Sequence, residues 1–197
     1  DLERKVAIVT GGSGSLGGRI CHALADAGSD VAVVYNRDSK GAKRHATEIK
    51  KKGIRSGTFQ CDVTDPTQVE SLVSQVLKSY ESVDILINNA GYNKWIPFTD
   101  LDAMTFNEWS KILDINLNGP MHCMRAVAPT MRRQGAGQIV NVSSVAGLSP
   151  TGSSIPYAVS KAALIHLTKC MAVALGPEVL VNAVAPGAFE GTGMSVN

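Results

Sequence analysis

The chain has 197 residues, of which 44% are hydrophobic, 18% charged and 5% aromatic. A chain of this length is typically one domain that buries a substantial core without crosslinks, and its 19 glycines and 8 prolines are too scattered for a collagen-like or disordered chain. The formal net charge of +2 is too small to indicate a nucleic-acid-binding surface. No run approaches the roughly 18 apolar residues of a membrane-spanning helix, so we expect none.

The cysteines and histidines show no pattern typical of a disulfide framework or a metal site. Four cysteines lie far apart without a Cys-x-x-Cys pair, and we interpret them as free buried thiols of a protein from a reducing compartment. We therefore predict a cytoplasmic location, with an organelle matrix as the alternative because the chain begins without Met. We expect no metal site, and only packing or surface roles for His22, His45, His122 and His166.

Short β-branched runs alternate along the chain with longer amphipathic segments. The short runs predict strands over residues 6–11, 30–36, 55–60, 83–88, 138–144 and 179–185. The longer segments predict helices over residues 16–27, 40–52, 66–79, 105–133 and 155–175. We expect Asp65 to be the N-cap of its helix, and Pro120 and Pro129 to break or kink the helix over 105–133.

This alternation predicts parallel strands joined by right-handed crossovers in one α/β domain over residues 1–197. We predict a Rossmann-like doubly wound parallel sheet with the strand order 3-2-1-4-5-6. Ligands of such sheets bind beyond the carboxyl ends of the strands. Chemistry is therefore expected just after Val9, Asn88, Val142 and Ala185.

A glycine-rich turn follows the first predicted strand. In the run Thr10 to Gly17, the glycines at 12, 14 and 17 satisfy G-x-G-x-x-G between a strand and a helix. Glycines let the backbone approach a pyrophosphate, and the helix N-terminus offers N–H donors to it. We favour phosphate binding; the alternative is tight packing of the helix on the strand.

The end of the second predicted strand bears on the choice of dinucleotide. NAD-binding sites place Asp or Glu there to accept from the ribose 2′-hydroxyl, whereas this chain has Tyr35 and Asn36 followed by Arg37. A guanidinium pairs well with a 2′-phosphate, which favours NADP(H) over NAD(H). The alternative is a solvated arginine that Asp38 neutralises.

A possible catalytic set lies in the second half of the chain. Tyr157 and Lys161 are four residues apart in a predicted helix, which places both side chains on one face. Ser144 ends the fifth predicted strand, so it shares the carboxyl edge of the sheet with Tyr157.

Together these motifs resemble the classical short-chain dehydrogenases/reductases, most closely the 3-oxoacyl-acyl-carrier-protein reductase-like members. The resemblance covers essentially the whole chain. It is carried by the Thr10–Gly17 turn, Asn88-Asn89-Ala90-Gly91, Asn116, Ser144, Tyr157-x-x-x-Lys161 and Pro186-Gly187.

The resemblance implies hydride transfer between a nicotinamide and a carbonyl or secondary alcohol. Tyr157 would be the general acid in reduction, and the Lys161 ammonium would lower its pKa from about 10 toward 7. Ser144 would donate to the substrate oxygen, and Asn116 would anchor a water that feeds protons to Lys161. The implied cofactor contacts are Gly11, Ser13, Gly14, Ser15, Leu16, Gly17, Asn36, Arg37, Asp62, Val63, Asn89, Ala90, Gly91, Tyr157, Lys161, Pro186, Gly187 and Thr192.

Two departures from the family pattern stand out. Relatives usually carry Gly where this chain has Ser15, which puts cofactor affinity in question but not the binding mode. Relatives also run to about 250 residues, so we expect a C-terminally incomplete chain that lacks the substrate lid and a last edge strand.

We therefore predict an NADP(H)-dependent oxidoreductase of fatty acid biosynthesis, a 3-oxoacyl thioester reductase. We expect no nucleic-acid or membrane partner, and a homotetramer or homodimer built on the helices near residues 105–133 and 155–175, which carry surplus apolar residues. Two alternatives remain. One is an NAD(H)-dependent sugar, polyol or other alcohol dehydrogenase, and the other is a non-catalytic NADP(H)-binding sensor or scaffold.

Overall fold

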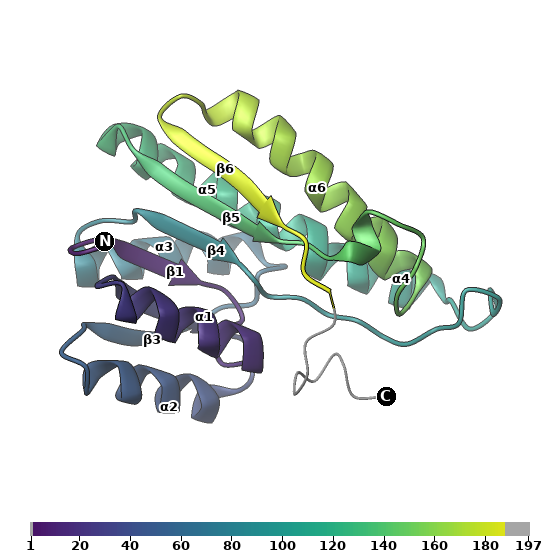
Figure 1. Ribbon diagram of the computed structural model, residues 1–197, viewed down its shortest axis with the longest axis horizontal. Helices are drawn as coiled ribbons and strands as arrows, with labels where there is room; N and C mark the ends of the chain where they lie inside the picture. The colour runs from purple at the N-terminus through teal and green to yellow at the C-terminus, as the bar shows by residue number, and fades with distance from the viewer. Residues whose placement is uncertain (1, 188–197) are drawn as a thin grey trace.

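Six parallel strands form one sheet in the order β3-β2-β1-β4-β5-β6, which confirms the predicted topology (Figure 1). The computed structural model describes residues 2–187. The strands are β1 (Val6–Val9), β2 (Asp30–Tyr35), β3 (Ser56–Gln60), β4 (Ile85–Asn88), β5 (Gly137–Val142) and β6 (Val179–Val184). The α-helices are α1 (Ser15–Asp26), α2 (Ser39–Lys50), α3 (Pro66–Tyr80), α4 (Phe106–Leu113), α5 (Gly119–Gln134) and α6 (Ile155–Leu175).

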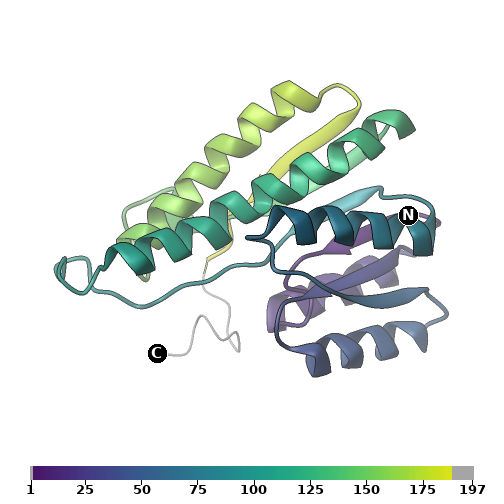
Figure 2. The ribbon, with the colours of Figure 1, turned by 180° about the vertical axis from the view of Figure 1, so that it is seen from behind.

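Helices cover both faces of the sheet, because the side chains of each central strand alternate between two apolar cores. In β1, Val6 and Ile8 join a core with α3, α5 and α6, whereas Ala7 and Val9 join a core with α1 and α2. Figure 2 shows α3, α5 and α6 side by side over one face. On the opposite face, no helix of residues 2–187 covers β6, where Leu180 and Val184 are exposed (Figure 1).

The start of α3 follows the sequence prediction. The Asp65 carboxylate accepts hydrogen bonds from the backbone N–H of Thr67 at 2.9 Å and of Gln68 at 3.3 Å. Pro66 occupies the first turn, where a missing N–H removes no intrahelical bond. Asp65 is therefore the N-cap, as expected.

The segment predicted as one helix over residues 105–133 is three elements. A wide π-helical turn, η1 (Asp114–Asn118), separates α4 from α5, and Pro120 lies directly after it, in the first turn of α5. The expectation for Pro129 was wrong as regards a break, because α5 continues to Gln134. Burial of the α5 residues on either side of Pro129 against the sheet compensates for the hydrogen bond that this proline cannot make.

The expectation about membrane helices also needs correction. By length and composition α6, with 21 residues, is apolar enough to cross a membrane. It nevertheless packs on β6 and the short 3₁₀ turn η2 (Val145–Gly147) and contributes Leu164 and Leu175 to the buried interior. It also buries the amine-bearing Lys161. In this fold one side of α6 packs on the sheet, and 33% of its apolar window is buried.

Candidate active site

The turns after β1 and β4 are locked together by Thr10 and Asn89. The Thr10 hydroxyl accepts from the backbone N–H groups of Asn89 and Ala90, both at 3.0 Å. In return, the Asn89 amide donates to the carbonyls of Thr10 at 3.0 Å and Gly11 at 3.3 Å. Asn89 and Ala90 thus fix the glycine-rich turn at the carboxyl edge of the sheet.

The glycines of this turn have different roles. Gly11 has a φ of +64°, in the left-handed region that favours glycine. A Cβ at Gly17 would lie 2.2 Å from the Gly11 carbonyl oxygen, and one at Gly12 would lie 2.9 Å from Val33 Cγ1. These two positions therefore serve close packing, as the alternative interpretation holds. Gly14 differs, since the nearest atom to its Cβ position is 3.4 Å away.

The N-terminus of α1 has the form of a phosphate site. Gly14 is its N-cap residue and provides no side-chain cap, unlike Asp65 of α3 or Ser154 of α6. Ser13, Ser15 and Leu16 lie in the same turn. A helix N-terminus whose glycine N-cap leaves room for a ligand suits an anion. This stretch fits the pyrophosphate of a dinucleotide.

The loop after β2 presents a positive side chain. Arg37 is exposed, and its guanidinium has no hydrogen bond or ion pair with residues 2–187. Asp38, which we considered as a neutralising neighbour, instead caps α2 by accepting from Gly41 N at 2.9 Å. Burial raises the pKa of Asp62, but the hydrogen bonds from the Thr64 backbone N–H and hydroxyl, together with Asn36, outweigh it and leave the pKa lowered.

Several other predicted cofactor contacts lie at the carboxyl edge of the sheet. Val63 is buried in the core against Gly119, and its carbonyl oxygen lies 3.1 Å from His122 Nδ1, so neither its side chain nor its carbonyl is free for a ligand. The Pro186 carbonyl accepts from Val145 N at 3.0 Å and ties the end of β6 to η2. Gly91 follows Ala90 in the turn after β4, and Gly187 ends the described part of the chain. Thr192 lies outside the described residues.

Ser144, Tyr157 and Lys161 come together where β5 ends and α6 begins. Ser144 lies close enough to the Tyr157 hydroxyl to lower its pKa, and the Lys161 Nζ lies 5.7 Å from the centroid of the Tyr157 ring. Lys161 is only 4% exposed, and its Nζ donates to the Val142 carbonyl at 2.8 Å. The residues that we predicted from spacing and sheet position thus form one cluster.

The protonation of this cluster differs from the expectation. We expected Lys161 to lower the pKa of Tyr157, but burial raises the Tyr157 pKa, and the hydrogen bond from Ser144 only partly opposes this. Burial lowers the pKa of Lys161 from its ordinary value of 10.5 to about 8. The physical reason is that the Lys161 amine is itself desolvated and is directed to the Val142 carbonyl.

Asn116 sits in the wide turn η1, with its side chain fully buried. Its amide oxygen accepts from Tyr92 N at 2.8 Å, and its amide nitrogen donates to the Tyr92 carbonyl at 2.9 Å and to Ser160 Oγ at 3.1 Å. The side chain therefore holds the turn after β4 against α6. With these hydrogen bonds and no exposed surface, the Asn116 side chain itself is not placed to anchor a water.

Sequence reasoning missed a buried ladder of polar side chains behind the site. The Asn88 amide donates to Asn141 Oδ1 at 2.8 Å, and the Asn141 amide donates to Thr168 Oγ1 at 2.9 Å. The ladder joins β4, β5 and α6 through the interior. The available signal was Asn141, a lone amide in the apolar run of the fifth predicted strand. Tyr92, which meets both Asn116 and Glu108, had no such signal.

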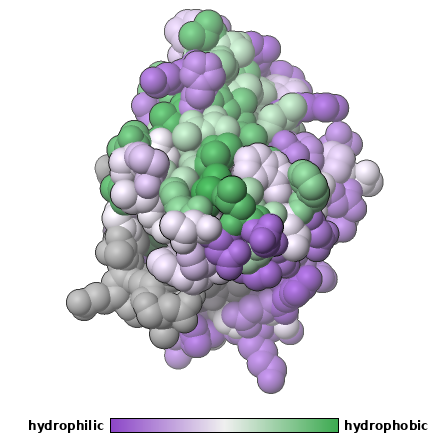
Figure 3. All heavy atoms as spheres, turned by 90° about the vertical axis from the view of Figure 1, so that its right-hand side faces the viewer, coloured by the Kyte–Doolittle hydropathy of each residue, from purple (hydrophilic) through white to green (hydrophobic). Residues whose placement is uncertain are grey.

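The face that carries these groups is viewed directly in Figure 3. Apolar side chains gather in its centre and upper part, and hydrophilic ones border them. The segments after β4 and β5 contribute large exposed apolar residues at this end of the sheet: Trp95, Leu101, Phe106 and Leu148. A doubly wound sheet with a phosphate-type helix end beside a Ser, Tyr and Lys cluster defines a dinucleotide-dependent oxidoreductase.

Comparisons with known proteins agree with this class. The model of the short chain dehydrogenase family matches residues 5–197. The chain is 38% identical over 184 residues to the 3-oxoacyl-acyl-carrier-protein reductase FabG of Staphylococcus aureus. This alignment covers 93% of this chain and 74% of FabG. The chain is 34% identical over 190 residues to sorbose reductase SOU1 of Candida albicans, and this alignment covers 94% of this chain and 66% of that protein.

A solved structure of NAD+-bound xylitol dehydrogenase superposes with a TM-score of 0.90 at 31% identity, covering 95% of this chain and 71% of that one. This chain belongs to the short-chain dehydrogenase/reductase family, and it is an oxidoreductase of that type.

Proposed function

We propose that this chain reduces 3-oxoacyl thioesters with NADPH, in the manner of a fatty acid biosynthesis reductase. The observation that carries the proposal is the Ser144–Tyr157–Lys161 cluster, which lies at the same edge of the sheet as the N-terminus of α1. The 38% identity to FabG supports the thioester substrate. The apolar residues that surround this end of the sheet support a substrate with an acyl chain.

The α1 turn, Arg37 and Lys161 would hold the cofactor, which supplies the hydride when it is bound. Tyr157 donates its hydroxyl proton to the substrate oxygen as the general acid. Ser144 donates a hydrogen bond to the same oxygen, where negative charge develops. With a pKa of about 8, Lys161 exchanges protons near neutral pH and can reprotonate Tyr157.

Three features support NADP(H) over NAD(H). The guanidinium of Arg37 is exposed and unpaired within residues 2–187, Asp38 is engaged as a helix cap, and no carboxylate occupies the end of β2. A bidentate guanidinium–phosphate pair adds affinity that a ribose hydroxyl cannot provide. Arg37→Ala should therefore raise the KM for NADPH about tenfold and leave that for NADH unchanged. Arg125→Ala, which removes an exposed charge from α5, is the matched control and should change neither.

Turnover tests the proposal directly. When purified protein is mixed with NADPH and acetoacetyl-CoA, NADPH should be oxidised and its near-ultraviolet absorbance should decrease. Tyr157→Phe should lower kcat by at least about 100-fold with unchanged NADPH affinity, since it removes only the acid. Tyr80→Phe, a phenol at the far end of α3, is the control and should retain activity. Full activity of Tyr157→Phe, or no turnover of any ketone tested, would overturn the proposal.

A polyol or sugar dehydrogenase is the second candidate, favoured by the likeness to sorbose reductase and to NAD+-bound xylitol dehydrogenase. Faster oxidation of xylitol or sorbitol with NAD+ than reduction of acetoacetyl-CoA with NADPH would select it. Tight NADPH binding without turnover of either substrate class would instead select a sensor.

The assembly we propose is a homotetramer or homodimer in the cytoplasm. Apolar side chains remain exposed on the two longest helices, namely Met121 on α5 and Val159 and Val173 on α6. Of these three residues, Val173 is the most exposed, at 87%, and would bury the largest fraction of its surface in a subunit contact. Val173→Glu should shift the sedimentation of the assembly toward smaller species, and an unshifted assembly would remove α6 from the interface.

A further inference from the structure

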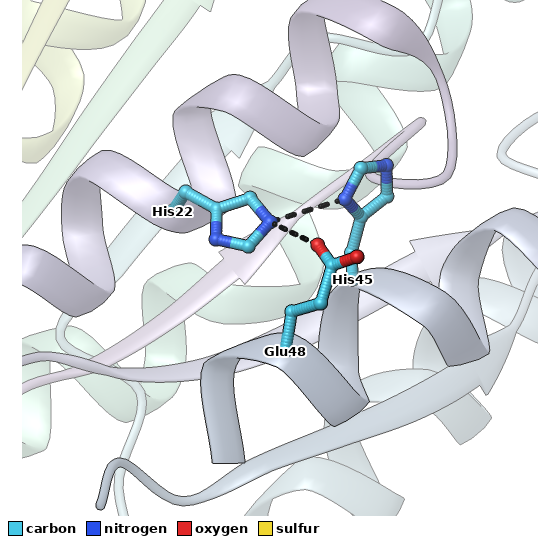
Figure 4. A group of neighbouring side chains, drawn as sticks. All are labelled: His22, His45 and Glu48. Carbon is cyan, nitrogen blue, oxygen red and sulfur yellow. Dashed lines mark hydrogen bonds and ion pairs between the residues drawn. The ribbon is translucent and has the colours of Figure 1, made fainter. Parts of the chain in front are cut away.

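Two histidines and a glutamate converge between α1 and α2, although we expected only packing or surface roles for these histidines. His22 lies on α1, and His45 and Glu48 lie one turn apart on α2 (Figure 4). The His22 Nε2 is 3.2 Å from the His45 Nδ1 and 3.2 Å from the Glu48 carboxylate. Twenty-three residues separate the histidines, so the fold rather than any local spacing brings them together.

The arrangement is built into the packing of the two helices. A Cβ at Gly18 would lie 2.4 Å from the His45 ring, so the glycine makes the room that this imidazole occupies. The two imidazoles pack edge to face, with centroids 5.3 Å apart and planes at 75°. His22 and Glu48 remain partly accessible, with 25% and 47% of their side chains exposed.

As long as Arg44 contacts His45, hydrogen bonds alone do not satisfy this cluster. The Arg44 guanidinium, 3.4 Å from the His45 Nε2, can only donate, so that contact requires the proton of neutral His45 to be on Nδ1. The His45 Nδ1–H then donates to the His22 Nε2, so this nitrogen carries a lone pair and no proton. The same lone pair faces the Glu48 carboxylate, and the contact between the two acceptors is repulsive. With a proton on His22 Nε2 instead, His45 must accept at Nδ1, and its Nε2–H faces the donors of Arg44. Each assignment leaves one contact repulsive.

A cation satisfies the three facing atoms together. In a tetrahedral zinc site with bonds of about 2.0 to 2.1 Å to nitrogen and oxygen, neighbouring ligand atoms are about 3.3 Å apart. Two of the three distances between the ligand atoms are 3.2 Å, and the third, from His45 Nδ1 to the Glu48 carboxylate, is within 4.8 Å. The exposed Arg44 lies at the opposite side of the His45 ring and is free to turn toward solvent.

We propose that His22 Nε2, His45 Nδ1 and a Glu48 carboxylate oxygen bind a first-row divalent transition metal of the zinc class. Two imidazoles and a carboxylate are a ligand set typical of zinc, with water in the remaining position. The ion would crosslink α1 to α2, the two helices whose N-termini flank the proposed dinucleotide site. Its role would be structural, because Ser144, Tyr157 and Lys161 belong to other elements.

Zinc titration of the chelator-treated protein by calorimetry tests the site. Wild-type protein should bind one Zn²⁺ with micromolar or tighter affinity, and saturating Zn²⁺ should raise its Tm by several degrees. His22→Gln and Glu48→Gln should each weaken binding at least about tenfold, since even groups that only support a ligand contribute 10- to 100-fold. Arg44→Ala should tighten binding, because it removes a nearby positive charge and the competing donor.

The matched control is His166→Gln. His166 and Cys170 are exposed four residues apart on α6 and could bind zinc in place of the proposed site. Binding should be unchanged in that variant, and Co²⁺ substituted into the protein should show no thiolate charge-transfer band. Circular dichroism establishes that each variant is folded. Zn²⁺ binding that is equal in wild type, His22→Gln and Glu48→Gln would overturn the proposal, as would the absence of binding at about 100 μM Zn²⁺.

Discussion

Replacing Lys161 with Met should change how stability depends on pH. The folded chain buries the Lys161 amine and lowers its pKa from 10.5 to about 8. Each pKa unit corresponds to about 1.4 kcal/mol, so burying the protonated amine costs the fold about 3 kcal/mol at pH 7. Met fills a similar volume without charge, but it leaves the Val142 carbonyl without its donor, which costs about 1 to 3 kcal/mol.

The sign of the effect follows from the direction of the pKa change. Because the folded pKa is lower than the unfolded one, the folded state binds fewer protons between about pH 8 and 10.5, and the wild type gains stability as pH rises through that range. Lys161→Met lacks this group, whereas all other titrating groups are common to both proteins. The unfolding free energy of the wild type minus that of the variant should therefore increase by about 3 kcal/mol between pH 7 and 10.5.

Urea unfolding of both proteins at several pH values measures this difference. Oxidoreductase activity should be lost in the variant at every pH, which separates the stability effect from the catalytic one. If the difference in unfolding free energy between the wild type and Lys161→Met stayed constant from pH 7 to 10.5, the conclusion that burial destabilises the Lys161 ammonium would be refuted. That result would mean that the Lys161 amine is solvated in the folded protein.

Two further substitutions test how the fold is held. Gly17→Ala places a methyl group 2.2 Å from the Gly11 carbonyl oxygen and should lower the unfolding free energy by about 1 to 3 kcal/mol. Gly14→Ala places its methyl group 3.4 Å from the same oxygen, an ordinary contact distance, and should lower the unfolding free energy less. Equal effects in thermal unfolding would contradict the packing described for this turn. Asp65→Ala removes two hydrogen bonds at the start of α3 and should cost about 1 kcal/mol in urea unfolding, while Asp65→Asn should retain most of the stability.

Much of the architecture could be predicted because it depends on local patterns. The alternation of β-branched runs and amphipathic segments predicted the parallel strands, the doubly wound fold class supplied their order, and the residue type at Asp65 predicted the cap of α3. The cluster of Ser144, Tyr157 and Lys161 followed from helical spacing and from the shared edge of the sheet.

What could not be predicted depends on contacts between distant segments. The Asn88–Asn141–Thr168 ladder and the His22–His45–Glu48 cluster each join separate elements, and no spacing in the sequence encodes them. The protonation of Lys161 was missed because spacing shows that Tyr157 and Lys161 share a helix face, but it does not show how completely that face is desolvated. Pro129 was misjudged because tertiary packing overrides a local preference.

The wide turn between α4 and α5 has a consequence for protein engineering. A π-helical turn inserts one residue relative to a regular helix and so rotates everything downstream by about 100°. Deleting one residue from Asp114–Asn118 would straighten the helix and turn Cys123, Val127 and Met131 away from the sheet that now buries them. The length of this turn therefore decides which face of α5 lies against the sheet. A chimera with another member of the family must take the turn and α5 from the same parent.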